Sequence, residues 1–150
     1  MEYRRATSKD ITAFVQNRIE FVTSIREIAD IESFERNTTK YLVENIDSDK
    51  LIIFISIDDG DIISSCMACL FETVPLPSCL SGKSAELLNV YTKKMHRNKG
   101  HSRKLLELII EEMKKAGVET IHLTYTEDGL GIYEKMGFSP LERQMQLKLR

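Results

Sequence analysis

The residues best suited to chemistry lie in a short basic turn, residues 97–102, which read Arg-Asn-Lys-Gly-His-Ser. An apolar, strand-like run over residues 85–92 precedes this turn. The apolar residues that recur at helical spacing after it are Leu105, Leu106, Ile109, Ile110 and Met113. The turn therefore opens a helix, whose first N–H groups have no internal partner and carry partial positive charge. Because Gly100 has no Cβ, a ligand can approach the backbone closely, and the pattern is typical of a phosphate or pyrophosphate site.

Charge is concentrated at the same place. Six of the 21 basic residues lie between Lys93 and Lys104, where there is no acid, although the whole chain has a net charge of −2. A cationic patch on an acidic body suits a compact polyanion better than a long duplex. Tyr91 is the only aromatic residue near the patch that could stack on a base. We therefore expect no nucleic-acid partner.

The cysteines do not predict a metal or disulfide site. Cys66, Cys69 and Cys79 are odd in number, which argues against a disulfide framework. Cys66 and Cys69 lie on an expected strand, where a spacing of three places the two sulfurs on opposite faces. The three histidines are scattered and complete no zinc site, so we expect no metal.

Length and composition indicate one ordinary globular domain over residues 1–150. Hydrophobic residues make up 42% of the chain and charged residues 29%. No apolar run approaches ~18 residues, so we expect no membrane span. The first residues, Met1–Arg5, lack the apolar core of a secretion signal, which makes the cytoplasm the expected compartment.

The remaining pattern supplies the elements that must position the turn. It predicts strands over residues 3–6, 51–57, 62–72, 85–92, 120–125 and 144–149. It predicts helices from Thr7 or Ser8 to about Ile25, over 32–46, from the turn to Gly117, and over 127–136. Arg18 interrupts the apolar stripe of the first helix, and Asp58–Asp61 reads as a hairpin turn. Together these elements predict an α/β (α+β) domain with a mixed sheet.

The spacing Arg97-x-x-Gly100-x-Ser102 resembles the acyl-CoA signature of the GNAT superfamily of N-acetyltransferases. That signature reads Arg or Gln, two residues, Gly, one residue, then Gly or Ala, so Ser102 is a small but imperfect match. Residues 89–92, Asn-Val-Tyr-Thr, and residues 132–138, Ile-Tyr-Glu-Lys-Met-Gly-Phe, resemble two further family blocks. The resemblance implies a single GNAT-like domain with a mixed, mostly antiparallel central sheet of six to seven strands, flanked by about four helices.

The resemblance also implies acetyl-CoA as cosubstrate, with its pyrophosphate held by the backbone of the turn. In the family the preceding strand splays from its neighbour, so Val90 and Thr92 would offer backbone groups to the pantetheine arm. Thr126 stands where the family often has asparagine. The implied cofactor-binding residues are Val90, Thr92, Arg97, Asn98, Lys99, Gly100, His101, Ser102, Arg103 and Gly129.

Tyr133 is the candidate general acid. Its phenol, with a pKa of ~10, can donate a proton or a hydrogen bond to a departing thiolate of pKa ~8–9. It matches the family's tyrosine. The alternative is a tyrosine that only packs in the core.

Glu86 is the candidate general base. A lysine-like amine is roughly 0.1% neutral at pH 7, so a carboxylate or an ordered water is needed to take its proton. A glutamate eleven residues before Arg97 resembles the base of histone-type family members. Glu86 could instead be exposed or salt-bridged, and Asn89 or a water could orient the substrate.

These residues lead to one main hypothesis and one alternative. The main hypothesis is an enzyme that transfers acetyl from acetyl-CoA directly to a primary amine of a small molecule or peptide, without a covalent acetyl-enzyme. The alternative is a non-catalytic CoA-binding or sensing domain of the same fold. The loop 73–84 and the N-terminal helices should select the acceptor. A homodimer is expected from the resemblance alone.

Overall fold

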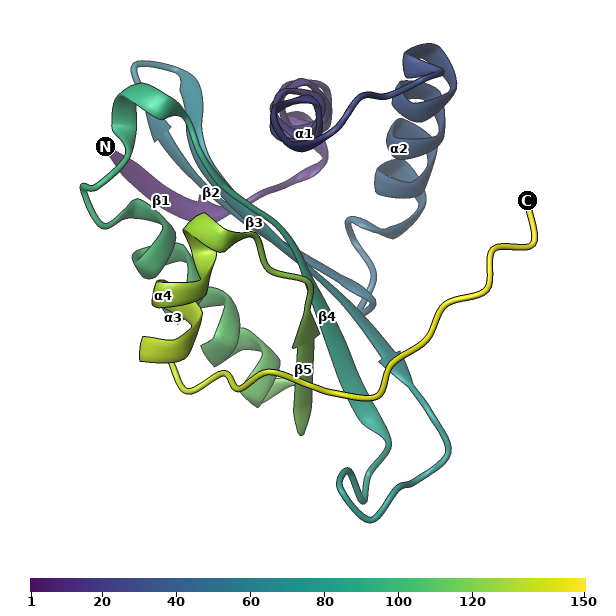
Figure 1. The fold of residues 1–150 in the computed structure, drawn as a ribbon. Coiled ribbons are helices and arrows are strands. Elements are labelled where there is room, and N and C mark those ends of the chain that lie inside the picture. Colours follow the sequence, from purple (N-terminus) through teal and green to yellow (C-terminus); the bar gives the residue numbers. More distant parts are fainter.

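The computed structural model of the protein describes residues 1–150 as one five-stranded sheet with helices on both faces (Figure 1). The strands are β1 (Glu2–Arg5), β2 (Leu51–Asp58), β3 (Asp61–Glu72), β4 (Lys83–Thr92) and β5 (Thr120–Leu123). The main helices are α1 (Ile11–Ile25), α2 (Ile31–Asn45), α3 (His101–Lys115) and α4 (Leu130–Lys135). The strand order is β1-β2-β3-β4-β5, antiparallel except for the parallel pair β4–β5. The expected mixed, mostly antiparallel sheet with four helices is confirmed.

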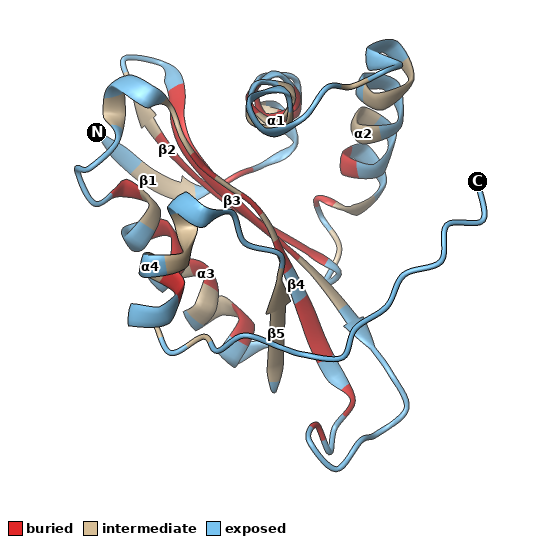
Figure 2. Ribbon diagram, viewed as in Figure 1, coloured by how far each residue is buried: buried red, intermediate tan, exposed pale blue.

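The sheet separates two hydrophobic cores. On one face α1 and α2 pack over Ile53 and Met67, and on the other face α3 and α4 pack over Ile52 and Ala85. Figure 2 shows buried residues along the central strands and on the sides of the helices that face them. The uninterrupted apolar run of β2 follows from this arrangement, because alternate residues of a central strand enter opposite cores.

The two nearby cysteines confirm the expected alternation. Cys66 belongs to the core beneath α3, whereas Cys69 packs against the core beneath α1 and α2. Both are free thiols, as is Cys79. The pair therefore forms neither a disulfide nor a metal clamp.

Two turns that the sequence predicts have the backbone that their residues require. Asp59 and Gly60 both have positive φ, 50° and 79°, as a type I′ hairpin between β2 and β3 demands. Gly117 has a φ of 80° and ends α3, and the N–H of Val118 donates to the Met113 carbonyl. The hairpin and the end of α3 are confirmed.

The expected sixth strand is wrong. Residues 139–150 form no helix or strand and make no backbone hydrogen bond, so the sheet has five strands rather than six to seven. Met145, Leu147 and Leu149 alternate as a strand would, yet these residues are 101%, 83% and 88% exposed. An alternating pattern determines only which face of a strand would be buried. A strand also needs the free edge of another strand for its backbone hydrogen bonds, and these residues have none. In Figure 1 this C-terminal segment ends well away from the sheet.

Candidate active site

The basic turn between β4 and α3 exposes a row of unused backbone donors. Asn98 and Gly100 have positive φ, 63° and 84°, and α3 begins directly after Gly100. The consecutive N–H groups of Asn98–Arg103 donate no hydrogen bond within the protein. A Cβ on Gly100 would meet no atom within 4 Å, so the space beside Gly100 is open. Free donors at a helix N-terminus with open space above them are suited to bind an anion.

The surrounding charges favour the same ligand. Lys93 pairs with Asp61 and Arg103 with Glu107, but Arg97, Lys99 and Lys104 have no ion pair. These three side chains leave positive charge beside the free N–H groups. A pyrophosphate therefore fits the donor set that the turn offers.

Side chains tie the turn to the end of β4. The Arg97 Nε donates to the Thr92 carbonyl at 3.0 Å, and the Thr92 and Ser102 hydroxyls lie 2.7 Å apart. A second 2.7 Å contact joins Thr92 to the hydroxyl of Ser64 on β3. Ser102, which stands where the signature has glycine or alanine, thus makes a structural contact that neither of those residues could make. The Thr92 carbonyl, expected to be free, already accepts from Arg97.

His101 faces the interior, although it belongs to the turn. Its ring is buried, and its Nδ1 lies 2.7 Å from the hydroxyl of Tyr3 on β1. Burial lowers the pKa of His101, which disfavours the charged form of the ring. Only the backbone of His101 is therefore available to a ligand at the turn.

Beyond its first half, β4 has an open edge. Pairing with β5 covers only Ser84–Leu87, and in Figure 1 β5 lies beside only part of β4. A β-bulge interrupts the pairing of this second half with β3, because Asn89 and Val90 together oppose Cys66. Val90 and Thr92, the two residues expected to offer backbone groups to the pantetheine arm, lie on this open stretch.

A buried polar chain holds the bulge. Asn89 has a φ of 53°, a conformation that asparagine tolerates better than most residues. Its Nδ2 donates to the Ser65 hydroxyl at 2.9 Å, which donates in turn to Oδ1 of Asn17 at 2.6 Å. Arg18 Nη1 donates to Oδ1 of Asn89 at 3.1 Å. The bulge is thus fastened to α1, a link that sequence reasoning missed because its partners are 71 positions apart.

Tyr133 lies on the α3 side of the sheet. The residue is 8% exposed, and its ring packs edge-on against Phe138, with centroids 5.8 Å apart. Gly129 lies against the same ring, because a Cβ there would approach Tyr133 Cε2 to 3.0 Å. The Tyr133 hydroxyl makes no hydrogen bond within the protein. Burial raises the pKa of Tyr133 to about 12, so the phenol stays protonated at physiological pH.

Glu86 lies on the opposite face. It is exposed, makes no ion pair, and stands opposite Cys69 on β3 and His122 on β5. Residues directly opposite on neighbouring strands share a face, so Glu86 points to the α1–α2 side. The two candidate catalytic residues therefore lie on opposite faces of the sheet.

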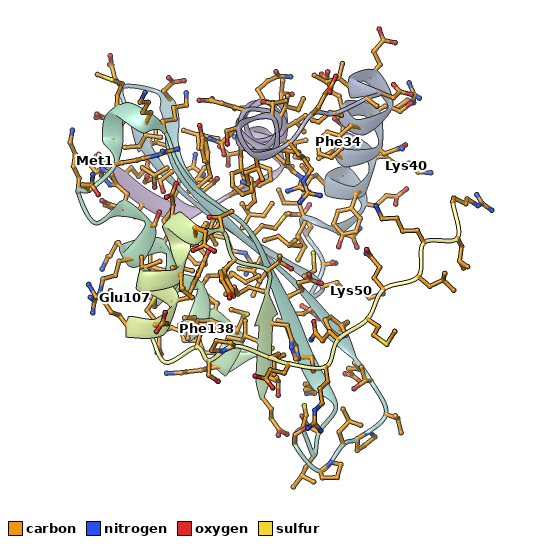
Figure 3. The ribbon with its side chains drawn as sticks, viewed as in Figure 1. Met1, Phe34, Lys40, Lys50, Glu107 and Phe138 are labelled. Carbon is orange, nitrogen blue, oxygen red and sulfur yellow. The ribbon has the colours of Figure 1, made fainter.

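A cavity of about 330 Å³ lies on the α1–α2 side. Its lining residues are Arg18, Phe34, Asn37, Thr38, Tyr41, Leu42, Met67, Cys69 and Leu88. The Arg18 guanidinium carbon lies 5.5 Å from the centroid of the Phe34 ring, and Figure 3 shows Phe34 in the space between α1 and α2. A larger cavity, of about 740 Å³, borders Glu112 and Lys115 in the last turn of α3. That cavity lies at the end of α3 remote from the basic turn.

No cluster of three or more His, Cys, Asp or Glu side chains is placed to hold a metal ion. None of the helices has the length and hydrophobicity needed to cross a bilayer. Burial raises the pKa of the Cys66 thiol, so this cysteine is poorly suited to act as a nucleophile.

The model of the acetyltransferase (GNAT) family matches residues 21–138. No curated protein matches the sequence at a significant level. The structure resembles a predicted acetyltransferase from Clostridium acetobutylicum, solved with acetyl-CoA, with a TM-score of 0.90, 24% identity, and coverage of 99% of this chain and 96% of that one.

Two further solved structures share the fold. A GCN5-related N-acetyltransferase from Ralstonia eutropha JMP134 has a TM-score of 0.86 and 21% identity, over 98% of this chain and 97% of that one. Glucosamine-6-phosphate N-acetyltransferase from Arabidopsis thaliana has a TM-score of 0.73 and 20% identity, over 99% of this chain and 98% of that one.

Proposed function

The chain belongs to the acetyltransferase (GNAT) family, and on that premise we propose that it is an acetyl-CoA-dependent N-acetyltransferase acting on a primary amine of a small molecule or peptide. One observation carries the proposal. The free N–H groups of Asn98–Arg103 stand next to the stretch of β4 that pairs with β3 on one side and has no neighbouring strand on the other. A molecule with an anionic head and an extended amide arm would use both features, and acetyl-CoA has this form.

The head of acetyl-CoA is proposed to bind at the turn. The N–H groups of Asn98–Arg103 donate to the pyrophosphate oxygens, and Arg97 and Lys99 supply charge from the rim. The backbone near Val90 pairs with the pantetheine arm along the open edge of β4. Because β4 and β5 separate there, the thioester can reach the far face of the sheet, where Glu86 lies.

In the proposed reaction the amine nitrogen attacks the thioester carbonyl, the C–N bond forms, and the C–S bond breaks to release thiolate. Glu86, directly or through a water, takes the proton from the amine before or during attack. We propose direct transfer without an acetyl-enzyme, because the buried Cys66 thiol is poorly suited to carry the acetyl group.

Tyr133 is proposed to stabilise the departing thiolate. Burial holds its pKa at about 12, above the ~8–9 of a thiol, so the phenol is better suited to donate a hydrogen bond to the sulfur than to give up its proton. The proton that the thiol finally carries comes from solvent. Tyr133 thus serves as a donor aimed at developing charge.

Thiol release tests this function. Purified protein is incubated with acetyl-CoA and a panel of amino acids, polyamines, aminosugars and short peptides, and free thiol is measured. We expect amine-dependent release of CoA with at least one amine class, and mass spectrometry should detect the acetylated amine. Tight binding of acetyl-CoA with no turnover across the panel would instead support the non-catalytic CoA-binding domain.

A further inference from the structure

Arg18 is a half-buried cation without an acidic partner. It lies on α1, and its guanidinium makes one side-chain hydrogen bond, from Nη1 to Oδ1 of Asn89. None of the ion pairs in the structure includes Arg18, whereas Arg4 and Arg103 both pair with carboxylates. Removing a charge from water costs free energy unless an opposite charge or ligand compensates. The free N–H groups of Arg18 are therefore available to an anion.

The cavity around Arg18 makes this site specific. Arg18 is the only charged residue that lines it, so the cavity carries a single positive charge. Met67 and Leu88 from the sheet and Phe34 from α2 provide apolar walls. A volume of about 330 Å³ suits one small molecule.

The cavity lies on the face of the sheet away from the basic turn. Its lining residue Cys69 stands opposite Glu86 on the neighbouring strand, so the cavity lies on the same face of the sheet as the candidate base. A molecule seated there would approach the β4–β5 opening from the side opposite to the bound cosubstrate. The cavity therefore has the position expected of an acceptor site.

We propose that this cavity binds the acceptor, that the acceptor is a small primary amine carrying a carboxylate, as an amino acid does, and that Arg18 binds the carboxylate. The amino group then lies toward Glu86. This inference rests on the proposed function, because it names the acceptor class of the same reaction.

The charge balance favours a carboxylate over a phosphate. A phosphate group near neutral pH carries more than one negative charge, and protein sites usually meet it with several cations or a row of N–H groups. The cavity offers one guanidinium and no lysine. A planar guanidinium matches the geometry of a carboxylate, and Asn89 occupies only one of the Arg18 nitrogens.

The first test compares matched acceptors. The thiol-release assay is run with each common L-amino acid and with its amide, for example leucine and leucinamide. The amide has nearly the same shape, lacks the charge, and has the more readily deprotonated amine, so preference for the acid must come from binding. We expect kcat/KM to be ~30-fold higher for the acid of the preferred side chain, as a charge-assisted hydrogen bond supplies.

Variants assign the preference to Arg18. In Arg18→Gln the preference for the acid should disappear, because kcat/KM should fall for the acid and stay the same for the amide. Arg18→Lys should keep part of the preference. Arg36→Gln, which removes an exposed charge of α2 outside the cavity, should keep all of it. Equal rates for acid and amide in the wild type, or a full preference in a folded Arg18→Gln protein, would overturn the inference while leaving N-acetylation intact.

A binding measurement separates this inference from the proposed function. Calorimetry follows the binding of N-acetyl-leucine, N-acetyl-phenylalanine and their amides to the wild type and to Arg18→Gln in the absence of acetyl-CoA. Binding of an acid that depends on Arg18 would support the carboxylate site even if no turnover occurred. The absence of such binding, together with no turnover of any amino acid, would overturn it.

Discussion

The hydroxyls of Thr92 and Ser102 lie 2.7 Å apart and join the last residue of β4 to the first turn of α3. This contact gives a reason for serine at a position where the acyl-CoA signature has glycine or alanine. It also shows that the geometry of the anion site depends on the end of a strand as well as on the helix.

Replacing Ser102 with alanine tests this relationship. Ser102→Ala removes one partly buried hydrogen bond and restores a residue of the family signature, while Thr92 keeps its contact with Ser64. We expect a loss of about 1 kcal/mol in the free energy of unfolding and acetyl-CoA affinity within about threefold of the wild type. Denaturant unfolding and calorimetry measure the two quantities. A loss of affinity beyond tenfold with unchanged stability would make Ser102 a direct ligand.

Asp10 should give the fold a specific acid sensitivity. Hydrogen bonds from Arg4, and then from the backbone of Thr7, lower the pKa of Asp10 to about 2. A lowered folded-state pKa contributes stability above the unfolded value of about 4, and that stability is lost as pH falls through about 2. Asp10→Asn should therefore reduce Tm near pH 6, and the difference from the wild type should shrink toward pH 2. A difference in Tm that does not change with pH would contradict the assignment.

Removing the hydroxyl of Tyr133 should separate chemistry from packing. The hydroxyl has no partner in the protein, so Tyr133→Phe should keep its thermal stability and its acetyl-CoA affinity. Turnover should fall ~10²-fold or more, because the lost hydrogen bond acts on charge that develops in the transition state. Tyr3→Phe is the matched control, since it loses the contact with His101 and should affect stability more than turnover. If Tyr133→Phe kept more than about half of the wild-type turnover, the hydroxyl would have no role in the reaction and Tyr133 would be a packing residue only.

Local signals in the sequence predicted most of the fold. Asp59-Gly60, Gly100 and Gly117 each require a positive φ, and each lies at a turn or helix end that the sequence predicts. The run of β2 and the stripe of α3 identified the buried elements, because burial leaves a periodic pattern in nearby residues.

The features that the sequence did not predict depend on residues far apart in the chain. The contact of Arg18 with Asn89 joins α1 to β4, and no local pattern indicates it. Residues 144–149 show the converse, because their alternation is that of a strand although no strand edge pairs with them. The catalytic roles of Tyr133 and Glu86 stay predictions until turnover is measured.

Calorimetric titration of acetyl-CoA into the wild type, Gly100→Glu and Gly117→Glu tests the central claim most directly. Both glycines have φ near 80°, so the two substitutions impose similar backbone strain at opposite ends of α3, and neither position is crowded by backbone. We expect acetyl-CoA to bind to the wild type and to Gly117→Glu. We expect loss of binding in a folded Gly100→Glu protein, because the added carboxylate would lie beside the free N–H groups and repel the pyrophosphate. Affinity of Gly100→Glu within threefold of the wild type, or no binding by the wild type, would contradict the claim.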